Sequence, residues 1–233
     1  MARFFEYGDE EVAYLKARDP KLAAAIDAVG HVNREMMEEG DLFAAVVHHI
    51  IGQQISSAAQ ATVWARLQEA LGEITPAAVC AATSEQLQSC GTSFKKVEYI
   101  KGFAEKVASA EFDLDAVAHM PDGEAIKALS SLPGIGEWTA EMLLLFCLGR
   151  PDILSFGDLA IHRGMRMVYH HRKVTRAMFE KYRRRYSPYG SVASLYLWAV
   201  SHMDVPGYDR DYAPMTEAQK KAARKKRAAK SEK

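Results

Sequence analysis

The chain has 233 residues, of which 48% are hydrophobic, and its 30 Lys and Arg balance its 30 Asp and Glu. This length and apolar content suffice for a buried core in one domain or in two small lobes. No apolar run reaches the about 20 residues that cross a bilayer, and the N-terminus has no apolar signal core, so we expect a cytoplasmic protein without a membrane partner.

The sequence reads as one amphipathic helix after another, and alternating β-patterns are essentially absent, so the predicted fold class is all-α. Thr75, Thr83 and Ser93 are typical helix starts, and Asp122 is a candidate cap. The helices predicted with both ends cover, in chain order, residues 9–18, 21–29, 41–53, 56–71, 123–130, 136–148, 158–168, 175–185 and 191–203.

Basic charge is unevenly distributed along the chain. Residues 217–233 hold eight Lys and Arg and two Glu, which leaves 22 basic and 28 acidic residues elsewhere. Residues 162–186 carry nine Lys and Arg against a single acid, Glu180. Such a local concentration is what a phosphate backbone attracts, although a solvated helix face has the same composition. We predict a folded domain over residues 1–213 and a frayed or disordered basic tail over 214–233.

The cysteine content excludes several metal sites. Cys80, Cys90 and Cys147 are irregularly spaced and form no CxxC or CxxH pair. Three such residues cannot hold an iron–sulfur cluster bound by four thiolates, and they do not form a zinc site.

Residues 132–140, with the sequence LPGIGEWTA, are the most informative segment. Gly134 and Gly136 can take positive φ and allow another backbone to come close. The helix that follows begins with free amides, and together with the helix dipole these favour an anion such as a phosphate. Asp158, a short distance downstream, would then lie beside a nucleic acid held at this turn.

This segment resembles the hairpin of the helix-hairpin-helix DNA glycosylases, and it is most similar in pattern to the DNA-3-methyladenine glycosylases II of bacteria and yeast. Three further matches follow the family's order, at residues 50–56 (IIGQQIS), 91–100 (GTSFKKVEYI) and 188–194 (PYGSVAS). The resemblance implies two helical lobes with the hairpin beside the cleft between them. Some relatives have an N-terminal α/β lobe or an iron–sulfur loop, and neither is expected here.

The resemblance implies that Asp158 is catalytic. Breaking an N-glycosidic bond builds positive charge on the sugar, which a nearby carboxylate stabilises while it orients or deprotonates water. The family segment has the form P-x-D-D-L-x-I, whereas this chain reads SFGDLAI over residues 155–161, with Gly157 in place of the first Asp. The alternative is that Asp158 only caps the next helix, and the two roles are compatible.

Trp138 stands where bifunctional relatives have a Schiff-base lysine, so the resemblance implies a monofunctional enzyme that uses water. Trp138 and Trp198 match positions that flank the flipped base, where an indole face attracts a cationic alkylated purine. Met142 replaces an aromatic residue of the same pocket found in some members. Simple core packing is the alternative for Trp138.

Several residues are candidates for DNA contact. Gln54 matches the wedge that fills the gap left by a flipped nucleotide, and Gln53 precedes it. For both, the alternative is a helix-terminal amide bonded to backbone. The remaining candidates are the hairpin amides of Gly134, Gly136 and Thr139, and the side chain of Arg163 in the basic segment.

The family often binds a monovalent cation through hairpin carbonyls. In this chain these would be the carbonyls of Ser130, Leu132 and Ile135, holding Na⁺ or K⁺, and no other cofactor is expected. The predicted function is a monomeric glycosylase that flips alkylated purines out of damaged double-stranded DNA and hydrolyses their glycosidic bond. The alternatives are a related glycosylase for oxidised or deaminated purines, and a non-catalytic helix-hairpin-helix DNA-binding protein.

Overall fold

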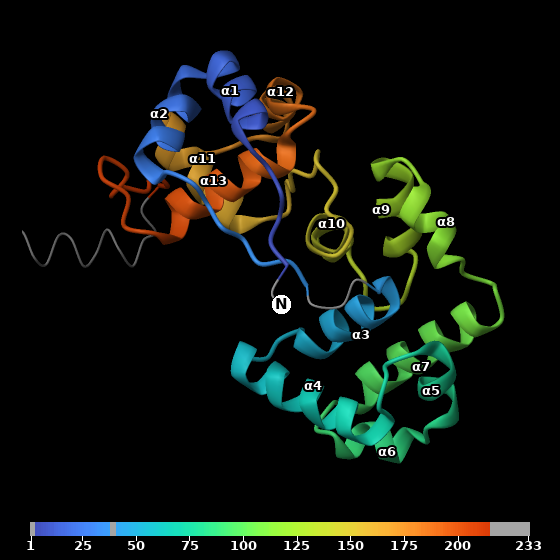
Figure 1. Ribbon diagram of the computed structural model, residues 1–233. Coiled ribbons are helices and arrows are strands. Elements are labelled where there is room, and N and C mark those ends of the chain that lie inside the picture. The colour runs from blue at the N-terminus through green and yellow to red at the C-terminus, as the bar shows by residue number, and fades with distance from the viewer. Residues whose placement is uncertain (1–2, 38–40, 215–233) are drawn as a thin grey trace, which may run out of the picture.

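The computed structural model describes residues 3–37 and 41–214, so nearly all of the predicted basic tail lies outside the described residues. Within the described residues the chain forms thirteen α-helices, and a single isolated bridge between Phe4 and Glu35 is the only β-pairing. The all-α prediction is confirmed (Figure 1). None of the helices in this part of the chain is long and apolar enough to cross a membrane.

The helices form two lobes with a helical hairpin between them (Figure 1). Helices from both ends of the chain pack into what we call the terminal lobe: α1 (Asp9–Arg18), α2 (Pro20–Val29), α11 (Leu159–Tyr169), α12 (Arg176–Tyr186) and α13 (Gly190–His202). The middle of the chain forms the central lobe: α3 (Leu42–Gly52), α4 (Ser57–Leu71), α5 (Pro76–Ala81), α6 (Ser84–Ser89) and α7 (Phe94–Ala108).

The hairpin connects the lobes. It consists of α9 (Asp122–Ser130) and α10 (Glu137–Phe146), and α8 (Leu114–His119) precedes it. Helix α10 packs against both α9 and α3 and lies between the lobes (Figure 1). Most of α10 is buried, because its apolar residues surround the whole helix rather than one stripe.

The buried carboxylate of Asp19 connects the N-terminal helices to α11 and α12. Asp19 is 1% exposed and caps α2 by accepting the amides of Lys21 and Leu22. Its other oxygen accepts from the Tyr169 hydroxyl at 3.0 Å and from the Arg185 guanidinium at 2.5 Å. The carboxylate is therefore paired and fully hydrogen-bonded, as a buried charge must be, and it ties α2 to α11 and α12.

Helices α11 and α13 cross at unusually close range. A Cβ atom on Gly164 would lie 2.2 Å from the backbone oxygen of Leu197, so only glycine fits at this crossing. Because Asp158 is the residue that precedes α11, this crossing also fixes the position of the candidate catalytic carboxylate.

Several predicted caps are confirmed, since the side chains of Thr75, Thr83 and Ser93 each accept an amide of the helix that follows. The prediction for Asp122 is wrong. Pro121 precedes the helix, and Asp122 is its first residue and lies 3.3 Å from Arg150 in an ion pair. Helix α8 was not expected, because six residues are too few to show a helical period.

Candidate active site

Asp158 lies at the start of α11 with its carboxylate almost fully hydrogen-bonded. One oxygen accepts the amides of Ala160 and Ile161 at 2.8 and 2.9 Å, which makes Asp158 the helix cap. The other oxygen accepts the indole N–H of Trp138 at 2.8 Å. The side chain is 8% exposed, and the dipole of α11 favours its negative charge. The capping role is therefore confirmed, and the carboxylate is held in one orientation.

Trp138 bonds Asp158 and is also partly exposed to solvent. It is the second residue of α10, and its ring remains 44% exposed although its N–H is bonded. Simple core packing does not leave an indole half-exposed. A free indole face beside a carboxylate is suited to stack on a planar, positively charged group.

The hairpin turn is built against the central lobe. Gly134 has φ +86°, and a Cβ there would lie 2.6 Å from the ring of Tyr99 on α7. The side-chain amide of Gln53 donates to the Gly134 carbonyl at 2.6 Å. The glycine is thus required both by its left-handed backbone and by the close approach of the tyrosine. Gln53 has the predicted alternative role, a helix-terminal amide bonded to backbone.

Gly136 precedes α10 and leaves the helix start open. Its φ of −92° is not left-handed, so the expectation of positive φ is wrong for this glycine. It has no side chain to cap the helix, and a Cβ placed there would meet nothing within 4 Å. The first-turn amides, including those of Trp138 and Thr139, therefore face a space that a phosphate can approach.

Gln54 lies on an exposed turn between α3 and α4. Its φ of 60° is left-handed, a conformation that costs a non-glycine residue about 1 kcal/mol or more. The side chain is exposed, and Ile55 beside it is 40% exposed. Leu159, next to Asp158, is 85% exposed. Strained or apolar residues displayed to solvent are typical of a contact surface.

The predicted pocket residues are not all brought together. Met142 is buried on α10, one turn after Trp138. Trp198 stacks on Phe146, the last residue of α10, with ring centroids 5.6 Å apart. Residues 138 and 146 are about 12 Å apart along a helix axis at 1.5 Å per residue. Trp138 therefore lies at the first turn of α10, whereas Trp198 packs on the last residue of this helix.

Arg163 is exposed on α11, one turn after Leu159, and it points away from the core. At the hairpin, the Leu132 carbonyl accepts the Ile135 amide at 3.1 Å. The Ser130 hydroxyl at the same turn is buried and has no hydrogen-bond partner. Carbonyls that end a helix lack intrahelical partners, so the carbonyl of Ser130, the last residue of α9, is a candidate ligand for a monovalent cation. The described residues contain no cluster of His, Cys, Asp or Glu suited to a metal ion.

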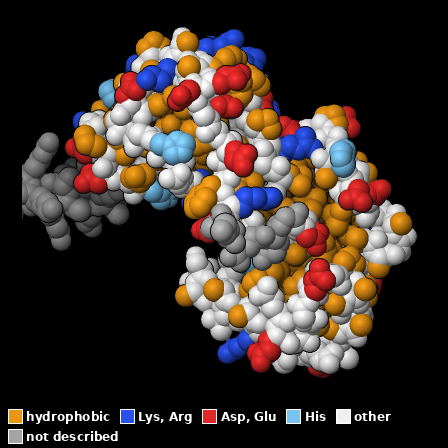
Figure 2. Space-filling view, in the orientation of Figure 1, with side chains coloured by type: hydrophobic (Ala, Val, Ile, Leu, Met, Phe, Trp, Pro, Cys, Tyr) orange, Lys and Arg blue, Asp and Glu red, His pale blue; other side chains and the backbone are white. Residues whose placement is uncertain are grey.

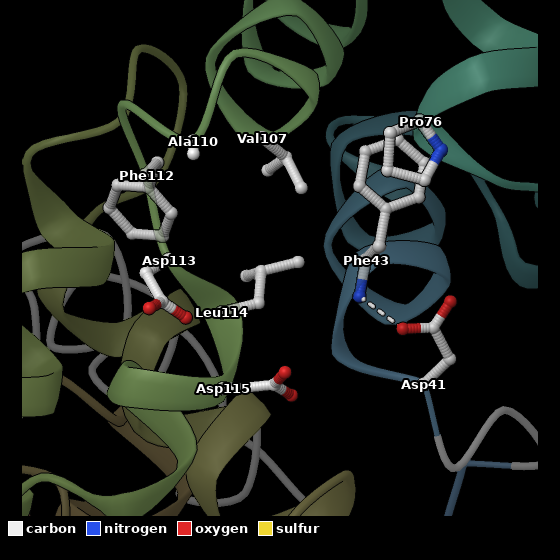
Figure 3. Close-up of a pocket in the computed structure, with 9 residues that line it drawn as sticks. All are labelled: Asp41, Phe43, Pro76, Val107, Ala110, Phe112, Asp113, Leu114 and Asp115. Carbon is white, nitrogen blue, oxygen red and sulfur yellow. Dashed lines mark hydrogen bonds between the residues drawn. The ribbon is translucent and has the colours of Figure 1, made fainter.

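A separate hollow of about 340 Å³ lies between α3, α5 and α8 and contains none of the predicted site residues. Figure 3 shows that Asp41, Asp113 and Asp115 lie around its apolar lining. Figure 2 shows hydrophobic side chains gathered on this face of the central lobe with acidic side chains beside them. Two of the aspartates cap helices: Asp41 caps α3 and Asp113 caps α8. The acidic rim is unsuited to a phosphate backbone.

Two charged residues near the site were not predicted. Lys96 donates to the carbonyls of Ile51 and Gln53, at 2.8 and 2.6 Å, and closes the end of α3. Glu141 on α10 is 7% exposed and accepts a hydrogen bond from the Ser155 hydroxyl. Burial raises the pKa of the Glu141 carboxyl to about 7. The only sequence signal for Glu141 is an acid within an otherwise apolar run.

Comparison with known proteins gives consistent matches. The model of the HhH-GPD superfamily of base excision DNA repair proteins matches residues 47–188. DNA-3-methyladenine glycosylase 1 of Schizosaccharomyces pombe is 28% identical over 196 residues, which are 82% of this chain and 86% of that protein.

Two solved structures are similar over most of their length. The DNA-3-methyladenine glycosidase of Bacillus halodurans has a TM-score of 0.77 and 30% identity, covering 86% of this chain and 93% of that one. The Schizosaccharomyces pombe 3-methyladenine DNA glycosylase, solved in complex with abasic DNA, has a TM-score of 0.71 and 26% identity. That match covers 87% of this chain and 100% of the other.

Proposed function

Because the chain belongs to the HhH-GPD superfamily of base excision DNA repair proteins, we propose that it is a monofunctional DNA glycosylase for alkylated purines of the 3-methyladenine type. Its relatives in fission yeast and Bacillus halodurans are named for 3-methyladenine excision. The substrate is damaged double-stranded DNA and the product is an abasic site. We infer that the enzyme acts as a cytoplasmic monomer.

The observation that carries this proposal is the pairing of Asp158 with the half-exposed Trp138 beside the hairpin. Departure of a purine leaves positive charge on the deoxyribose, and the fixed carboxylate of Asp158 stabilises that charge. Three hydrogen bonds orient the carboxylate before the substrate binds, so it does not reorganise during the reaction. Water then attacks the sugar.

Trp138 provides recognition rather than a covalent step. Its indole face attracts a cationic alkylated purine by about 0.5–2 kcal/mol. An alkylated purine is itself a good leaving group, so a strong general acid is unnecessary. No amine is available on α10 for a Schiff base, since none of residues 137–146 is a lysine.

DNA is held by the hairpin and by the turn that carries Gln54. The amides that begin α10 bind a phosphate, and the carbonyls of Ser130, Leu132 and Ile135 would hold a monovalent cation. Gln54 fills the gap that the flipped nucleotide leaves, and Arg163 contacts the backbone.

Release of methylated purines from methylated duplex DNA tests the proposal. The wild-type protein should release them, and Asp158→Asn should reduce the single-turnover rate by about 10²–10³ or more. Asn can still accept the α11 amides, so the fold and the affinity for abasic-site DNA should remain. Near wild-type turnover by Asp158→Asn would remove this residue from the mechanism.

Borohydride should trap no covalent complex between the enzyme and DNA, and strand cleavage should need added alkali or a lyase. Efficient trapping would contradict the monofunctional assignment. Release of only oxidised or deaminated purines would favour the related glycosylase specificity, and DNA binding without any base release would favour a non-catalytic protein.

A further inference from the structure

Side-chain contacts hold the segment of residues 155–158 that carries Asp158. The Ser155 hydroxyl donates to Glu141, and both side chains are buried. The Phe156 ring packs on Phe179, with centroids 5.2 Å apart. At Gly157 the backbone passes close to Trp138, since a Cβ added there would lie 3.7 Å from the Trp138 Cβ. The backbone before the carboxylate is therefore held as firmly as the carboxylate.

Both ends of this segment are fixed by one helix. Trp138 holds Asp158, and Glu141, three residues later on α10, holds Ser155. Residues three apart lie on the same face of a helix, about 5–6 Å apart between Cβ atoms. Helix α10 thus fixes the positions of both ends of the segment.

The Glu141 carboxyl lies outside the surface that contacts substrate. It lines a hollow of about 350 Å³ between α9 and α12, which also contains Glu137 of its own helix and Arg176 and Arg183 of α12. Burying a carboxyl disfavours its ionised form, and an apolar side chain would fill this place without that cost. What the carboxyl adds is an acceptor for Ser155.

We propose that Glu141 is a positioning residue, which through Ser155 holds residues 155–158 so that the Asp158 carboxylate keeps its place against Trp138. This inference rests on the proposed glycosylase function. It predicts that loss of the Glu141–Ser155 bond slows base excision without weakening DNA binding.

Single-turnover release of methylated purines tests this with four variants. Glu141→Ala and Ser155→Ala should each lower the rate by about tenfold to a hundredfold, since small misplacements of a reacting group have effects of this size. The double variant should be no slower than either single one, because both remove the same bond. Glu141→Gln should stay within about threefold of wild type, since its amide oxygen still accepts from Ser155.

Ser194→Ala is the matched control. It removes another buried serine hydroxyl, which bonds the Ile153 carbonyl just before this segment at 2.8 Å. It should lose stability but keep the excision rate. All five variants should bind undamaged duplex DNA as wild type does. Should Glu141→Ala fail to fold, Ser155→Ala, which deletes one oxygen atom of the same bond, decides the question.

A second measurement does not depend on activity. The Trp138 indole N–H gives one nuclear magnetic resonance signal, identified by its loss in Trp138→Phe. Relative to wild type, the chemical shift of that signal should change in Glu141→Ala and in Ser155→Ala, and it should stay at its wild-type value in Glu141→Gln. The Trp64 and Trp198 signals should not change in any of these variants. A wild-type protein that releases no base refutes the glycosylase proposal, and the Trp138 signal still tests the positioning. An active wild type with unchanged rate and Trp138 signal in both alanine variants overturns the positioning role alone.

Discussion

At the scale of single residues, one carboxylate performs two tasks. Asp158 begins α11 and also bonds the indole of Trp138. The hydrogen bonds that cap α11 therefore also fix the orientation of the carboxylate that we propose faces the sugar.

Glu141 predicts a pH dependence of stability. The pKa of its carboxyl rises on folding from 4.5 to about 7, so the folded state binds this proton more tightly than the unfolded state does. Its contribution to the free energy of unfolding is complete below about pH 4.5 and is lost as the pH rises through about 7. Thermal unfolding should therefore show Glu141→Gln gaining stability relative to wild type over this range.

The neutral Gln cannot titrate, so this variant isolates the Glu141 contribution from those of all other groups. A difference in melting temperature that stays constant from pH 4.5 to 8 would contradict the raised pKa.

Sequence motifs predicted the candidate site residues but not the contacts that hold them in place. Asp158, Trp138 and Gly134 were found because the hairpin and the segment after it are contiguous patterns. The Glu141–Ser155 bond and the Lys96 cap of α3 join residues that only tertiary packing brings together. The stacking of Trp198 on Phe146 likewise depends on the fold, and the proposal that Trp198 flanks the flipped base stays a prediction.

At the scale of helices, local chemistry predicted the helix starts at Thr75, Thr83 and Ser93, but it did not predict α8. Ser, Thr and Asp caps depend only on neighbouring amides, so they can be read from sequence. Helix α8 packs against α9, and its six residues are too few to show a helical repeat of apolar residues. The glycine in α11 is likewise unremarkable in sequence, and its role depends on α13.

Gly164→Ala should destabilise the protein, by about 1–3 kcal/mol, because the new methyl group would overlap the Leu197 carbonyl and force α11 away from α13. Urea unfolding measures this loss. Gly102→Ala is the matched control: it lies inside α7 with nothing within 4 Å of a new Cβ, so it should be neutral or stabilising by about 0.5–1 kcal/mol. Equal effects of the two substitutions would refute the steric argument.

At the scale of the whole molecule, the two lobes are joined at the hairpin. Gln53 of the central lobe bonds Gly134, and Lys96 holds the backbone of Gln53. The turn that carries Gln54 and the start of α10 are thus held at a fixed separation. The two-lobed form follows from the family resemblance, whereas this bond between the central lobe and the hairpin does not.

The basic segment over residues 217–233, which lies outside the described residues, should add DNA affinity without specificity. Each phosphate contact by one of its eight Lys and Arg contributes about 0.9 to the slope of log affinity against log salt. Deleting the residues after Pro214 should flatten that slope and weaken binding to undamaged DNA, while single-turnover excision stays unchanged. A collapse of the excision rate on truncation would place this segment in the catalytic domain.

The Asp19 contacts have a consequence for how the chain folds during synthesis. Helices α1 and α2 leave the ribosome first, yet Tyr169 and Arg185, their partners in this cluster, are made only near the end. The central lobe, which is contiguous in sequence, can fold meanwhile, since local contacts form before distant ones. We therefore expect α1 and α2 to complete their docking only after α11, α12 and α13 have been synthesised, although they precede these helices in the chain.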